Sequence, residues 1–164
     1  MPRAVIVNYR ECTGCRICEL ACSVRNEDVV SPQLSRIRVD PFPPSLDVPV
    51  VCVQCGKAPC IEACPLGLLI RDSETRAVVI QEELCNGCGS CINACPAQAI
   101  FMHPTQHVAI KCHLCEGEPE CVKLCPTDAL NIYDLPFDTR VFAKKSNEIA
   151  EELRKHVLIL PEER

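Results

Sequence analysis

The sequence contains no tryptophan, and aromatic residues make up only 4% of its 164 residues. Aromatic side chains normally supply much of the area that a protein buries in its core. A chain with so few of them is not expected to be held together by a large hydrophobic core alone. Bound metal would supply part of the missing folding free energy.

Several other sequence signals are lacking, and their absence narrows the range of functions that we expect for the chain. No apolar run approaches the length of a membrane-spanning helix. The first nine residues show neither an apolar signal-peptide segment nor a twin-arginine motif, so we expect a cytoplasmic protein. No glycine-rich nucleotide loop and no nucleophile with a base is visible, so we predict no catalytic residue. The formal net charge of −5 argues against nucleic-acid binding.

Cysteine, in contrast, is abundant. The chain has 16 cysteines, a density that indicates either a disulfide scaffold or a metal-binding protein. In a reducing compartment thiols stay reduced, so metal binding is favoured over disulfide bonds. All of the cysteines fall into four consecutive quartets: Cys12, Cys15, Cys18 and Cys22; Cys52, Cys55, Cys60 and Cys64; Cys85, Cys88, Cys91 and Cys95; and Cys112, Cys115, Cys121 and Cys125.

The third quartet has the spacing C-x2-C-x2-C-x3-C-P, which is the bacterial ligand run for [4Fe-4S] clusters. Three thiolates two residues apart lie on one tight loop and can hold three corners of a cluster. The fourth cysteine points elsewhere, in two-cluster ferredoxins to the partner cluster. Gly87 and Gly89 let the backbone approach closely. This quartet therefore predicts iron–sulfur ligands.

The other quartets repeat the pattern, and the second and fourth do so with an expanded loop. The first is spaced x2, x2, x3, the second x2, x4, x3, and the fourth x2, x5, x3. A compact quartet is followed twice by an expanded one, which indicates an internal duplication. Four such quartets predict four [4Fe-4S] clusters, with structural zinc and a disulfide framework as weaker alternatives. We interpret His113 as a solvated loop residue and not as a ligand.

Secondary-structure signals lie between and within the quartets. Residues 68–70 and 77–80 predict one hairpin, and residues 99–102 and 108–110 predict another. A short helix is expected after the third cysteine of each quartet. Together these elements predict an α+β fold of two ferredoxin-like βαβ modules, pseudo-duplicated, with a C-terminal extension and helix. The expected domains are residues 1–133 and 134–164.

Two segments do not follow this pattern. Residues 25–51 contain five prolines and are predicted to be a mostly irregular surface connection, with a short strand at 36–39. Residues 134–145 are predicted to form an extended arm. Residues 147–160 are predicted to form a helix that packs on its own protein through one apolar stripe, comprising Ile149, Leu153, Val157 and Leu160.

The run at residues 12–22, the proline-containing loops of the second and fourth quartets, and the order of the quartets resemble a known family. This is the family of four-cluster [4Fe-4S] ferredoxin-like electron-transfer subunits, of the dimethyl sulfoxide reductase type. The resemblance covers residues 9–132. The short form, with Arg36-Ile37-Arg38-Val39 after the first quartet, looks most like the small subunit of tungsten aldehyde oxidoreductases.

The resemblance implies a nested pairing, in which the first quartet shares two clusters with the fourth, and the second shares two with the third. The four implied ligand sets, called sites A to D, are Cys12, Cys15, Cys18 and Cys125 (site A); Cys22, Cys112, Cys115 and Cys121 (site B); Cys52, Cys55, Cys60 and Cys95 (site C); and Cys64, Cys85, Cys88 and Cys91 (site D). The lengths of the gaps between quartets also permit a tandem pairing of first with second and third with fourth.

The resemblance further implies a relay of single electrons between a large catalytic oxidoreductase subunit and a second redox partner. A tungsten or molybdenum pterin enzyme is the expected catalytic partner. The alternatives are a free-standing polyferredoxin carrier and a subunit of a hydrogenase, a formate dehydrogenase or a carbon monoxide dehydrogenase. A zinc-binding interaction module is a further rival. Two exposed ends would also allow copies of the chain to associate into a longer wire.

Overall fold

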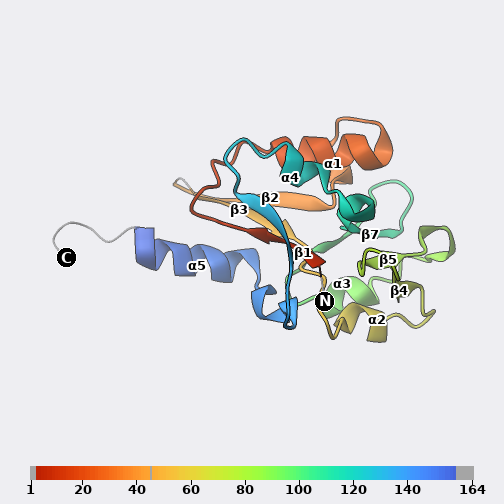
Figure 1. The fold of residues 1–164 in the computed structure, drawn as a ribbon. Coiled ribbons are helices and arrows are strands. Elements are labelled where there is room, and N and C mark those ends of the chain that lie inside the picture. Colours follow the sequence, from red (N-terminus) through yellow and green to blue (C-terminus); the bar gives the residue numbers. More distant parts are fainter. Residues whose placement is uncertain (1–2, 45, 158–164) are drawn as a thin grey trace.

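The structure is a computed structural model that describes residues 3–44 and 46–157 (Figure 1). Within this part of the chain, short strands pair two by two into antiparallel sheets, in the order β1–β8, β2–β3, β4–β5 and β6–β7. The strands are β1 (Arg3–Val7), β2 (Ile37–Phe42), β3 (Leu46–Val51), β4 (Leu69–Arg71), β5 (Val78–Ile80), β6 (Ile100–Met102), β7 (Ala109–Lys111) and β8 (Leu130–Asp134).

The two predicted hairpins are confirmed as β4–β5 and β6–β7. The described helices are also short: α1 (Ile17–Glu27), α2 (Pro59–Glu62), α3 (Ser90–Ala94), α4 (Glu120–Lys123) and α5 (Ser146–Val157), with 3-10 turns η1 (Pro32–Leu34), η2 (Glu82–Leu84), η3 (Leu114–Gly117) and η4 (Thr139–Phe142). Each of α1 to α4 begins one residue before the third cysteine of a quartet and contains it. The predicted helices are therefore present, although they start slightly earlier than expected.

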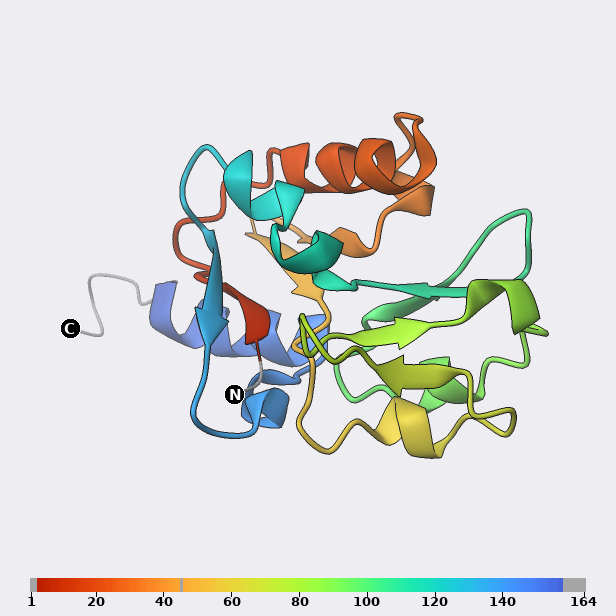
Figure 2. The same ribbon diagram turned by 45° about the vertical axis from the view of Figure 1, so that its right-hand side comes forward.

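These helices pack in two pairs. Helix α1 lies against α4, and α2 lies against α3, so the first quartet shares one part of the molecule with the fourth, and the second shares another with the third (Figures 1 and 2). Strand β1 pairs with β8, from Arg3 opposite Asp134 to Val7 opposite Leu130, and joins the N-terminal region to the exit of the fourth quartet. The mixed α/β class is confirmed, while the duplication and the boundary at residue 133 stay predictions.

The interpretation of residues 25–51 as an irregular surface connection was wrong. Helix α1 continues to Glu27, and β2 and β3 form a hairpin whose Ile37 and Val48 are 1% and 0% exposed. The prediction took the prolines as a sign of irregular structure, because proline lacks the N–H that a central strand needs. Each strand of a two-stranded sheet is an edge strand, however, and there a missing N–H is tolerated. The segment is part of the core, and the short strand expected at 36–39 lies within β2.

The C-terminal region is more structured than an extended arm. After β8, η4 turns the chain, and the side chain of Asp138 accepts hydrogen bonds from the backbone N–H groups of Gly56 (2.6 Å) and Arg140 (2.9 Å). Helix α5 then packs Ile149 and Ala150 on Val48 of the hairpin, as expected for a helix packed on its own protein. Leu160, the last member of the predicted stripe, lies outside the described residues.

Two of the hydrophobic cores in the described residues contain thiols, whereas the core beneath α5 contains none. One contains Cys18, Cys22, Cys52, Cys112 and Cys121, and the other contains Cys60 and Cys91. Aliphatic side chains fill the remaining space, which agrees with the scarcity of aromatic residues. None of the helices described for residues 3–44 and 46–157 is long and apolar enough to cross a membrane.

Candidate metal centres

Three cavities are each lined by four cysteines. One is lined by the cysteines of site A, one by those of site B, and one by those of site D. In each cavity, three cysteines come from one quartet and the fourth from another. The structure therefore places the last cysteine of a quartet beside its nested partner quartet, and not where a tandem arrangement would place it.

The thiols of site C also lie close together. The pKa of Cys55 is raised to about 12, mainly by burial and then by the neighbouring Cys52, Cys95 and Cys60. Burial likewise raises the pKa of Cys60 to about 11, with Cys52 and Cys95 adding to the shift. These mutual effects indicate that Cys95 of the third quartet lies beside three cysteines of the second.

The sites follow one another in a row. Cys18 of site A and Cys121 of site B lie in one hydrophobic core, which also contains Cys52 of site C. A second core contains Cys60 of site C and Cys91 of site D. The second and third quartets each contribute to both site C and site D. The spatial order is therefore A, B, C, D.

Burial keeps most of these thiols protonated when no metal is present. It raises the pKa of Cys18 to about 12 and, in site B, the pKa of Cys112 to about 12. A buried thiolate is costly unless a cation compensates its charge, so such thiols are poor nucleophiles. They would lose their protons on binding a metal, whose positive charge would compensate the thiolates.

Backbone donors face the cysteines that precede a proline. The N–H of Leu68 donates to Sγ of Cys64, and the N–H of Ala99 donates to Sγ of Cys95, both at 3.4 Å. Burial alone would raise the pKa of Cys125, but backbone donors in the turn after it, including the N–H of Thr127, hold it below its usual value. The turn that follows the last cysteine of each of these quartets thus donates hydrogen bonds to its sulfur, and such bonds stabilise a thiolate ligand.

The chain after Cys22 continues with Ser23 in place of a proline, and this cysteine has different hydrogen-bond donors. Its Sγ accepts hydrogen bonds from the backbone N–H of Arg36 at 3.2 Å and from the side chain of Asn26 at 3.5 Å. Nε2 of His113 contacts the side-chain Oδ1 of Asn26 at 2.7 Å, and the half-buried position of the imidazole lowers its pKa. The interpretation of His113 as a solvated residue was therefore wrong. The roles of Arg36 and Asn26 could not be read from the cysteine spacing.

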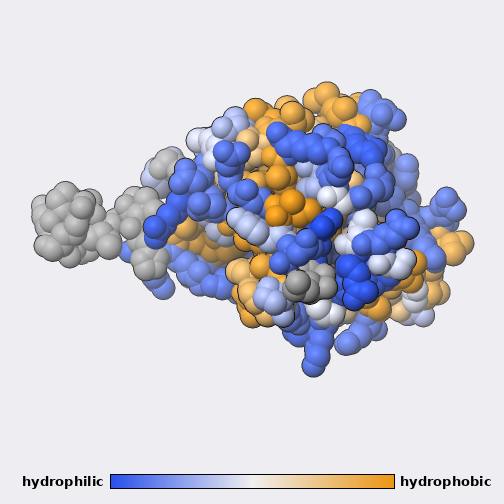
Figure 3. Space-filling view, in the orientation of Figure 1, coloured by the Kyte–Doolittle hydropathy of each residue, from blue (hydrophilic) through white to orange (hydrophobic). Residues whose placement is uncertain are grey.

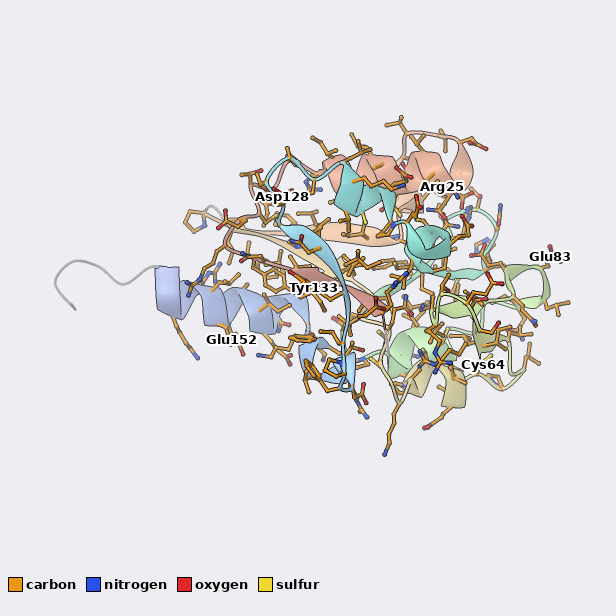
Figure 4. All side chains as sticks on the ribbon, viewed as in Figure 1. Arg25, Cys64, Glu83, Asp128, Tyr133 and Glu152 are labelled. Carbon is orange, nitrogen blue, oxygen red and sulfur yellow. The ribbon has the colours of Figure 1, made fainter. Side chains whose placement is uncertain are left out.

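The two outer sites reach the surface. Cys15 of site A and Cys88 of site D are exposed, whereas the other cysteines are buried or half-buried. Beside site A, Leu124 is 53% exposed and adjoins the exposed side chains of α1, over which apolar surface gathers at the top of Figure 3. Beside site D, Leu66 and Leu84 are 52% and 64% exposed. Figure 4 shows Cys64 near α2 and α3, in the part of the molecule away from Arg25 on α1.

Comparison with family models gives two matches. Residues 45–135 match the 4Fe-4S dicluster domain, and residues 10–25 match a 4Fe-4S binding domain. Together the two matches include all four cysteine quartets.

Curated relatives and solved structures agree with these matches. The chain is 45% identical over 94 residues to the polyferredoxin-like subunit of an aliphatic sulfonate oxidoreductase from Pyrococcus furiosus, covering 57% of this chain and 54% of that protein. It is 34% identical over 108 residues to the electron transport protein HydN of Escherichia coli K12, covering 61% and 59%. The chain thus spans little more than half the length of these relatives.

A solved structure shares the fold. A chain of the active site complex BamBC of benzoyl coenzyme A reductase aligns with a TM-score of 0.51 and 23% identity, covering 96% of this chain and 91% of that one. At this identity the likeness concerns the fold only.

Proposed function

Because the chain belongs to the 4Fe-4S dicluster domain family of ferredoxin-like electron-transfer subunits, we propose that it relays single electrons through four clusters, one in each of sites A to D. The observation that carries this proposal is the grouping of cysteines from nested quartets around shared cavities. Electrons would enter at one outer site, pass through sites B and C, and leave at the other outer site.

The donor set fits a cluster in each site. Four thiols line each of the cavities at sites A, B and D, and the rest of the cavity surface is largely apolar. A bound [4Fe-4S] cluster takes up and releases one electron at a potential that its surroundings set. The cysteines of this chain would hold each cluster through sulfur, and backbone N–H groups would donate hydrogen bonds to that sulfur, as they do to Cys22, Cys52 and Cys95. We assign no substrate site to the chain itself.

The exposed outer sites A and D are consistent with the docking of two partners, one at each end of the row. Cys15 and Cys88 bring the outer sites to the surface, and apolar side chains surround both ends, as is common at protein interfaces. We propose that a catalytic oxidoreductase subunit, of the tungsten or molybdenum pterin class, docks at one end in the cytoplasm, and that a second redox protein docks at the other. The name of the Pyrococcus relative, a subunit of an oxidoreductase, supports a role within a complex.

The free-standing carrier is a second candidate. The name of HydN, an electron transport protein, mentions no catalytic subunit and favours this alternative. The two candidates differ in whether the chain co-purifies with a larger enzyme.

The first test of this proposal is the metal content of the full chain isolated without oxygen. We expect about sixteen iron and sixteen sulfide per chain, because each of the four cubane clusters holds four of both. The brown absorbance should bleach when dithionite is added. Zinc in place of iron, or material without sulfide, would refute the proposal. Isolation of the untagged native complex would then identify the partner.

A further inference from the structure

A buried lysine lies between the two inner sites. Lys111 ends β7, directly before Cys112 of site B, and is 3% exposed. Its Nζ donates to the carbonyl oxygen of Cys112 at 2.8 Å, to Oε1 of Gln54 at 3.4 Å and to the carbonyl oxygen of Val78. Three acceptors match the three N–H donors of an ammonium group. Among the ion pairs of the described residues, none joins Lys111 to a carboxylate, so its charge is not neutralised there.

Gln54 connects this ammonium group to site C. It is fully buried between Cys52 and Cys55, two of the cysteines of site C. Its Nε2 donates to the carbonyl oxygen of Cys112 at 2.8 Å, and its Oε1 accepts from the backbone N–H of Val78 at 2.9 Å. The side chain is therefore held in one orientation, in which a single hydrogen bond joins the ligand loops of sites B and C.

The positive charge of Lys111 lies close to both inner sites. Its Nζ contacts the backbone of Cys112, a cysteine of site B, at 2.8 Å. It also contacts the side chain of Gln54, which stands between two cysteines of site C, at 3.4 Å. A cation in the low-dielectric interior stabilises negative charge placed near it.

We propose that the ammonium group of Lys111, held by Gln54, raises the reduction potentials of the clusters in sites B and C and thereby eases electron passage between the two halves of the relay. The inference rests on the proposed four-cluster relay. Each step moves one electron from a reduced cluster to its oxidised neighbour, and no bond or proton changes. Reduction adds one negative charge to the accepting site, which the nearby buried cation stabilises.

Two variants and one matched control test this proposal in the full, anaerobically isolated chain. Lys111→Gln removes the buried charge and keeps hydrogen-bonding capacity. Gln54→Glu keeps the side-chain shape and adds an opposite charge at the same junction. Lys57→Gln removes an exposed lysine from the ligand loop of site C, where solvent screens the charge. Redox titration followed by electron paramagnetic resonance measures the potential of each cluster.

In Lys111→Gln we expect two of the four clusters to become harder to reduce, by at least tenfold in the reduction equilibrium, which is about 59 mV for a one-electron couple. Gln54→Glu should shift the same two clusters in the same direction, and Lys57→Gln should shift none. Unchanged potentials in both variants, an equal shift of all four clusters, or loss of the inner clusters from both variants would show that Lys111 is only a structural support. A wild-type chain without iron and sulfide would instead refute the relay itself.

Discussion

At the scale of single residues, two glycines of the third quartet look alike in sequence but differ in surroundings. Gly87 and Gly89 have φ angles of +69° and +76°, a region that favours glycine. A Cβ on Gly87 would lie 2.0 Å from the backbone oxygen of His107, whereas a Cβ on Gly89 would meet nothing within 4 Å. Only Gly87 therefore lets the turn between β6 and β7 pack against the ligand loop of site D.

This difference predicts unequal effects of alanine at the two positions. Gly87→Ala should push the β6–β7 turn away and empty site D, with a loss of about four iron per chain. Gly89→Ala carries the same backbone strain, about 1–2 kcal/mol, without the clash, and should keep the full complement. Iron and sulfide analysis after anaerobic isolation provides the measurement. Equal iron contents in the two variants would contradict this account.

At the scale of elements, the β2–β3 hairpin is the platform for the C-terminal helix. Helix α5 contacts both strands, and Ile149 and Ala150 are 6% and 1% exposed where they meet Val48. The opposite side of α5 carries charged, exposed side chains such as Glu151. Burial of one apolar stripe on the hairpin thus holds the helix, because a helix of this length has little stability alone.

We expect Ile149→Ala to loosen α5 without disturbing the clusters. Truncation of a buried isoleucine costs about 2–4 kcal/mol, so amide hydrogen exchange in α5 should accelerate strongly while the visible absorbance stays unchanged. Glu151→Ala, on the exposed side, is the matched control and should leave exchange nearly as in the wild type. If both variants exchange at the same rate, the helix is not held by this contact.

At the scale of the whole molecule, long-range contacts decide which quartets are neighbours. The pairing of β1 with β8 and the packing of α1 on α4 bring the two ends of the cysteine region together, and α2 packs on α3. The result is a row of four sites with one exposed cysteine at each end, Cys15 and Cys88. In the proposed relay, an electron would therefore pass through both helix pairs.

The pairing can be tested by counting clusters in double variants. Cys22 and Cys115 belong to one site in the nested arrangement, so Cys22→Ser with Cys115→Ser should lose a single cluster and keep about twelve iron. Cys22→Ser with Cys55→Ser should lose two clusters and keep about eight. A tandem arrangement predicts the reverse order of iron contents. The single variants, each expected to keep about twelve iron, calibrate the comparison.

The sequence alone predicted the short helices, the hairpins β4–β5 and β6–β7, and the chemistry of the cysteines. These features are local, because the spacing of residues in one loop decides them. The hairpin at residues 37–51 escaped prediction, because its prolines are acceptable only in edge strands, a property of the assembled sheet. The hydrogen bond from Arg36 to Cys22 likewise joins segments that spacing does not relate.

What the sequence by itself determined is that the cysteines of this chain fall into four quartets whose motifs fit multiple [4Fe-4S] clusters. The tertiary structure decided which quartets meet, the order of the sites and the burial of Lys111 between the inner two. The spacing of three cysteines on one loop decides whether they can bind the same cluster. The placement of the fourth ligand depends on strands and helices that are distant in sequence, so only their packing in three dimensions could supply it.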